Sequence, residues 1–113
     1  MNQSTSELPY CVYILFSEKD HLLYIGFTTN LENRINNHNQ GRTKSTSYRR
    51  PLHLIFTEYY LFKEDALKRE KYFKTTAGKR AIKLMLSNTL EKLNYKKPNR
   101  RIEFLFEETE AER

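Results

Sequence analysis

The sequence has few residues that would loosen the chain or cross-link it. Only three glycines and three prolines occur among its 113 residues, which argues against long flexible linkers. Cys11 is the sole cysteine, so an internal disulfide is excluded, and such cysteine usage is typical of a reducing compartment. Because free cysteine usually behaves as a small apolar residue, we expect Cys11 to be buried.

Long apolar runs and targeting signals are also missing. No apolar run approaches the roughly 18 residues that a membrane-spanning helix needs. The opening residues, MNQSTSELP, contain neither the basic nor the apolar segment of a signal peptide. We therefore expect a cytoplasmic protein that does not bind membranes.

The length of the chain suits a single domain with a modest core. We expect a flexible N-terminus over residues 1–7, the folded domain over 8–94, and a basic linker with a C-terminal segment over 95–113. In this last segment Ile102, Phe104 and Phe106 alternate with more polar residues. That pattern indicates either an extra strand or a tail that becomes ordered on a protein partner.

Positive charge exceeds negative charge, with a net charge of +6. Such an excess attracts polyanions, so nucleic acid is the first partner to consider, although many basic proteins bind none. Arg42, Lys44, Arg49 and Arg50 cluster in the loop 40–50 with no acidic residue among them. Cations and hydroxyl groups are typical ligands of phosphate oxygens. The alternative is an ordinary solvated loop.

Three runs of strand-forming residues predict a small sheet. Residues 8–16 and 21–27 are rich in β-branched and aromatic residues, and a short polar patch joins them as in a β-hairpin. Residues 52–60 are almost continuously apolar or β-forming, which predicts a central strand covered on both faces.

Three further segments have helical periodicity. Thr29 and Glu32 match a capping box for a helix that ends near residue 39, before Gly41. A second helix is predicted over residues 63–74. A third is predicted over 79–93, with the core residues Ile82, Met85, Leu86, Leu90 and Leu93. The fold class is therefore α/β in the α+β sense: a mainly antiparallel three-stranded sheet flanked by helices.

Polar residues interrupt the apolar faces of two predicted helices. Arg34 and His38 lie one turn apart beside an apolar stripe, so we expect them at the edge of the buried surface. Glu70 lies within the apolar stripe of the second helix. A buried carboxylate is unfavourable unless it is paired or coordinated. An ion pair with an arginine and a bound metal ion are the two explanations.

These residues, taken in order, resemble the GIY-YIG nuclease family over about residues 8–86. The first family motif corresponds to Cys11-Val12-Tyr13, which keeps the tyrosine but not the leading glycine or the isoleucine. The second motif is intact as Tyr24-Ile25-Gly26, and Phe27 follows where the family often has a lysine or a similar residue. The match is closest to the small single-domain branch, whose members look like the N-terminal nuclease domain of the UvrC excinuclease.

The resemblance implies the GIY-YIG fold and a metal-dependent endonuclease that acts on DNA in repair or recombination. Tyr13 would be the general base, and Tyr24 would orient water or phosphate. Arg34 would bind phosphate through paired hydrogen bonds, and His38 would assist proton movement. Glu70 would hold a single divalent ion. Mg²⁺ or Mn²⁺ suits one hard oxygen ligand completed by water.

We expect Arg34, Lys44, Arg49 and Arg50 to hold the substrate phosphates. Since phosphate contacts carry no sequence information, cutting should be structure-selective or weakly selective. Two alternatives are a catalytically inactive module that binds nucleic acid and an adaptor subunit that docks through the segment 102–106.

Overall fold

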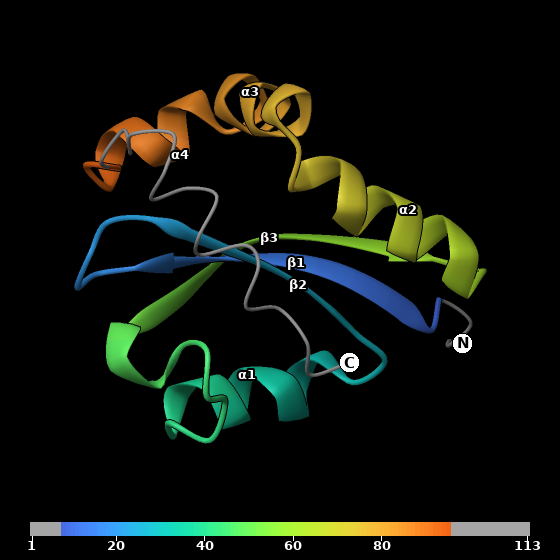
Figure 1. Ribbon diagram of the computed structural model, residues 1–113, viewed down its shortest axis with the longest axis horizontal. Helices are drawn as coiled ribbons and strands as arrows, with labels where there is room; N and C mark the ends of the chain where they lie inside the picture. Colours follow the sequence, from blue (N-terminus) through green and yellow to red (C-terminus); the bar gives the residue numbers. More distant parts are fainter. Residues whose placement is uncertain (1–7, 96–113) are drawn as a thin grey trace, which may run out of the picture.

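A three-stranded antiparallel sheet lies between two helical layers in the computed structural model, which describes residues 8–95 (Figure 1). The strands follow the spatial order β2-β1-β3. Their bounds are β1 Tyr10–Ser17, β2 Leu23–Thr28 and β3 Leu52–Tyr60. The predicted α+β class with a small antiparallel sheet is confirmed.

The two faces of the sheet are covered by different helices. One face carries α1, Leu31–Asn39, and the opposite face carries α2, Lys63–Phe73, with α3, Thr76–Met85 (Figure 1). The helix α4, Ser87–Lys92, continues the second layer. None of the helices within residues 8–95 is long and apolar enough to cross a membrane. The predicted boundaries at residues 1–7 and 95–113, and the segment 102–106, fall largely outside the described residues.

The central strand is β1, which corrects the prediction that residues 52–60 form it. Every residue from 11 to 17 is buried, whereas β3 is an edge strand that is only partly covered. Leu54 and Tyr59 of β3 remain exposed. The prediction was wrong because aromatic and branched residues suit any pleated surface, half-covered or fully covered, so composition alone does not rank the strands.

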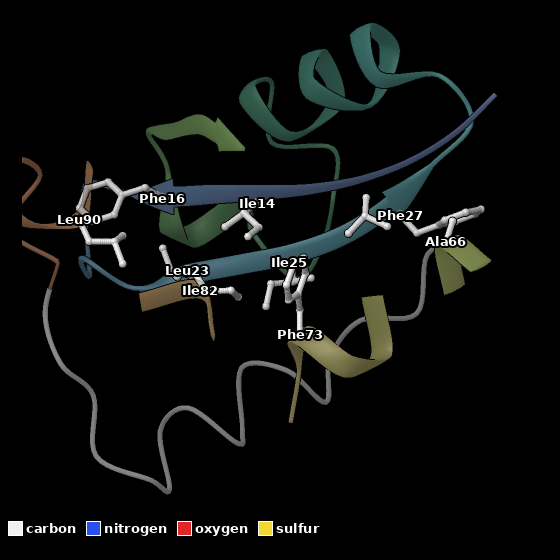
Figure 2. Close-up of a cluster of buried hydrophobic side chains, with 10 residues drawn as sticks. Ile14, Phe16, Leu23, Ile25, Phe27, Ala66, Phe73, Ile82 and Leu90 are labelled. Atoms are coloured by element: carbon white, nitrogen blue, oxygen red, sulfur yellow. The ribbon is translucent and has the colours of Figure 1, made fainter. Parts of the chain in front are cut away.

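Alternate side chains of β1 serve two separate cores. Val12, Ile14 and Phe16 face α2 and α3 and form the larger core (Figure 2). It is completed by Leu23, Ile25, Phe27, Ala66, Phe73, Ile82 and Leu90. The smaller core lies against α1 and contains Cys11, Tyr13, Leu15, Tyr24 and Leu52. Since side chains alternate along a strand, this division puts both motif tyrosines on the α1 face.

Two predicted helix ends are corrected. The cap of α1 is Asn30, whose side chain accepts the Asn33 N–H at 3.0 Å, rather than Thr29. The predicted helix 79–93 is two helices that meet at Leu86, and Met85, a predicted core residue, is exposed. Thr75 caps α3 by accepting the Gly78 N–H, so this helix begins earlier than predicted.

The larger core should dominate stability. Phe73 is fully buried and packs edge-to-face on Phe56, so we expect Phe73→Ala to lower the free energy of unfolding by about 3–5 kcal/mol. Leu84→Ala is the control: Leu84 is 80% exposed on α3, and its truncation should change stability by less than about 0.5 kcal/mol. Urea unfolding measures both, and equal losses would contradict this division of the core.

Candidate active site

Tyr13 lies at the centre of the α1 face and fits there because residue 26 is glycine. Gly26 pairs with Tyr13 across β1 and β2. A Cβ atom on Gly26 would lie 2.4 Å from both Cζ and the hydroxyl oxygen of Tyr13. Any side chain at residue 26 would therefore displace the tyrosine ring. The glycine of the second motif thus makes room for the tyrosine of the first.

The hydroxyl of Tyr13 joins a line of hydrogen bonds. It lies 2.8 Å from His38 Nε2, and Arg34 donates from Nε to the same oxygen at 3.4 Å. On the other side of the imidazole, His38 Nδ1 lies 2.8 Å from Thr46 Oγ1. The predicted residues Tyr13, Arg34 and His38 are therefore brought together. His38 is fully buried rather than at the edge, while Arg34 is partly exposed.

Tyr24 completes an aromatic cluster on this face. Its ring centroid lies 6.3 Å from that of Tyr13 and 5.0 Å from that of His38. Tyr24 keeps 4% of its surface exposed, and Tyr13 keeps none. Four of the predicted site residues thus share one small region on the α1 side of the sheet.

The basic loop is more ordered than the sequence suggests. Thr43, Ser45 and Thr46 are buried, and the 3₁₀ turn Ser47–Arg49 closes the loop. Thr46 is the residue that sequence reasoning missed. Nothing in the sequence distinguishes it from the neighbouring hydroxyl residues, since its position against His38 depends on how the loop folds back on α1.

Arg49 is a structural residue and is not available at the surface. It is 1% exposed, donates to Asp20 Oδ2 at 2.6 Å and donates to the Leu23 carbonyl at 3.2 Å. Ser17 also donates its hydroxyl to the Arg49 carbonyl at 2.6 Å. These bonds tie the loop to the β1–β2 turn. Arg49 therefore does not join the cations that a phosphate could reach.

Three other cations of this loop are exposed: Arg42, Lys44 and Arg50. Arg42 donates to Asn37 Oδ1 at 3.2 Å, and Arg50 donates from Nε to the Ser47 carbonyl at 2.9 Å. Both guanidinium groups keep further N–H donors beyond these bonds. The three exposed cations therefore lie on the same loop that places Thr46 beside His38.

Glu70 is buried in the apolar stripe of α2, as the sequence predicts, but α2 covers the face opposite to Tyr13 (Figure 1). Its carboxylate pairs with Lys74 Nζ at 3.1 Å, so a lysine is one partner of this buried group. Arg69, one residue earlier, pairs with Glu58 of β3.

The carboxylate fits a hard divalent ion with few protein ligands. Leu67, Glu70, Lys71 and Lys74 line a pocket of about 380 Å³. Within residues 8–95 no group of three or more His, Cys, Asp or Glu side chains could hold a metal. An ion at Glu70 would keep most of its water ligands, as Mg²⁺ usually does. The Glu70 carboxylate already binds one cation, the Lys74 ammonium, which indicates that its position favours a positive charge.

Cys11 and Phe27, two of the three departures from the family motifs, are packing positions. Cys11 is buried as expected, and burial raises the pKa of its thiol to about 11, so the thiol stays protonated near neutral pH. Phe27 faces the larger core on the opposite side of the sheet, where it stacks on Tyr10 at 6.2 Å. Neither residue adds a charged group to the Tyr13 cluster.

Comparison with known proteins identifies the family of this chain. The model of the GIY-YIG catalytic domain matches residues 9–83, so the chain belongs to the GIY-YIG family, a family of nuclease domains, as predicted. Nucleases of this family generally use a divalent metal ion.

The similar curated proteins include small proteins of the UPF0213 group. One from Clostridium perfringens is 40% identical over 87 residues, which are 76% of this chain and 92% of that protein. Another from Staphylococcus haemolyticus is 41% identical over 68 residues, or 59% of this chain and 83% of its own. No solved structure matches significantly.

The Asp20–Arg49 pair should make stability depend on pH. Burial opposes ionisation of Asp20, but the hydrogen bond and charge of Arg49 prevail and hold its pKa below the usual value. Stability from this pair is therefore present above the unfolded pKa, near 3.9, and is lost as pH falls through the lower folded value. Asp20→Asn should cost about 1.5–3 kcal/mol at neutral pH, since it removes the negative charge that pairs with Arg49 and one of the two oxygens that accept from it.

Urea unfolding of the wild type and Asp20→Asn between about pH 7 and pH 2.5 measures this effect. The difference between the two proteins should shrink toward acidic pH. Asp65→Asn is the matched control, because Asp65 is exposed on α2 and should show a small, constant difference. A constant difference for Asp20→Asn over the whole range would rule out the pair as the cause.

Proposed function

We propose that this protein is a metal-dependent endonuclease that hydrolyses phosphodiester bonds in DNA with structure-selective or weakly selective cutting. The observation that carries the proposal is the hydrogen-bonded line of Arg34, Tyr13 and His38 beside Tyr24. The hydrogen bond to Tyr13 holds the Arg34 guanidinium in one position. A guanidinium is the group best suited to bind a phosphate with two parallel hydrogen bonds. A role in DNA repair or recombination rests on the family resemblance.

The exposure of each side chain suggests which role it has in the proposed reaction. Tyr13 is 0% exposed, so its hydroxyl does not contact solvent in this state. We therefore assign the phosphate contact to Arg34 and the orientation of the attacking water to Tyr24. Tyr13 and His38 lie behind them, hold Arg34 in place and offer an internal acceptor for a proton. This modifies the expectation that Tyr13 acts directly on water as the general base.

Glu70 would hold Mg²⁺ or Mn²⁺ from the opposite face of the sheet. A divalent ion polarises the phosphate and neutralises charge that develops on its oxygens. Tyr24 belongs to β2, which is an edge strand, so the substrate position that we propose is along the edge of β2. Lys44 and Arg50 would hold phosphates farther along the backbone.

The metal ligand is tested by Glu70→Gln with Mn²⁺ and branched, nicked or single-stranded DNA. We expect kcat to fall at least about 10²-fold, the scale for loss of one group that stabilises transition-state charge. Glu64→Gln is the control, because Glu64 is exposed on the same helix. Undiminished cutting by Glu70→Gln would refute Glu70 as the metal ligand. If the wild-type protein binds DNA but cuts none of the substrates, it is a binding module.

The phosphate contacts are tested by the salt dependence of DNA binding. Lys44→Ala and Arg50→Ala should each weaken binding across all sequences and reduce the slope of log K against log salt by about 1. Lys92→Ala, an exposed change on α4, should leave that slope unchanged. Equal effects of all three substitutions would mean that general charge, rather than this loop, binds DNA.

A further inference from the structure

We infer that Thr46 is a positioning residue for the proposed phosphate site, because it fixes the tautomer of His38 and thereby the direction of the hydrogen bond between His38 and Tyr13, the oxygen of which accepts from Arg34. The inference rests on the proposed function for its link to DNA. The direction of the hydrogen bonds does not depend on that function and can be measured separately.

The two ends of the line set its direction. At one end, the Thr46 hydroxyl donates to the Thr43 carbonyl at 3.4 Å, and a carbonyl can only accept. At the other end, Arg34 donates to the Tyr13 oxygen, and a guanidinium can only donate. The Thr46 hydroxyl has one proton, so once that proton is directed to Thr43, the Thr46 oxygen can only accept from His38. The Tyr13 oxygen can accept from Arg34 while its own proton is donated to His38.

The protons on His38 follow from this order. Because Thr46 directs its own proton to Thr43, its oxygen accepts from His38 at 2.8 Å, which places a proton on Nδ1. The other nitrogen, Nε2, is then without a proton and accepts from the Tyr13 hydroxyl at 2.8 Å. The Tyr13 oxygen thus presents a lone pair to Arg34.

Without the Thr46 acceptor, the opposite tautomer becomes available. Nε2 would then carry the proton and donate to Tyr13, so two donors would meet at one hydroxyl. The Tyr13 proton would have to turn away from His38, and the oxygen would hold Arg34 less firmly. Thr46 therefore acts on phosphate binding through three bonds, without touching the substrate.

The test is long-range ¹H–¹⁵N NMR of His38 in the wild type, Thr46→Val and Thr46→Ser. We expect a proton on Nδ1 in the wild type and in Thr46→Ser, and protonation of Nε2 in Thr46→Val, which keeps the size but lacks the hydroxyl. Thr43→Val is the matched control, because Thr43 is also buried and contributes its carbonyl oxygen to the line. Unfolding curves establish that each variant is folded.

The same variants are then compared on DNA. We expect Thr46→Val to lose about 10- to 100-fold in kcat, the usual loss when an outer partner that orients a functional histidine is removed, and Thr46→Ser to recover most of it. A wild-type proton on Nε2, or an unchanged tautomer in Thr46→Val, would overturn the inference. If Thr46→Val changes the tautomer of His38 but the wild-type protein cuts no DNA, the hydrogen-bond assignment stands and only the nuclease function is refuted.

Discussion

The close contact between the Tyr13 ring and the backbone of Gly26 is the constraint on which the site depends. A Cβ atom at residue 26 would overlap the ring, so the Tyr13 side chain keeps this position only when residue 26 is glycine. The contact directs the Tyr13 hydroxyl toward α1, where His38 and Arg34 reach it. The position of the Tyr13 ring and the chemistry of the site therefore depend on the same packing contact.

The loop after α1 gives this arrangement its second support. Arg49 is buried and bonded to Asp20 in the β1–β2 turn, which draws residues 43–49 against the smaller core. Thr46 is thereby placed beside His38. A basic side chain in the middle of a charged loop thus serves as an internal anchor, and its exposed neighbours are left for polyanions.

Local periodicity predicts the hairpin and the first two helices, and a spacing of one helical turn puts Arg34 beside His38. The grouping of these two residues with Tyr13 is implied by the resemblance to the GIY-YIG family. The sequence does not predict that β1 rather than β3 is central, since strand order depends on long-range pairing. It also does not separate Arg49 from Arg50, which are adjacent and chemically identical. Arg49 is buried and Arg50 is exposed because Asp20, which is distant in sequence, pairs with Arg49 in the fold.

The most direct measurement is a crystal structure of the protein with Mn²⁺ and a short DNA. The account predicts Mn²⁺ on Glu70 and a DNA phosphate on Arg34, with the backbone along the edge of β2 and Tyr13 still bonded to His38. A phosphate bound on the α3–α4 surface, or Mn²⁺ held away from Glu70 with the Lys74 pair intact, would contradict it.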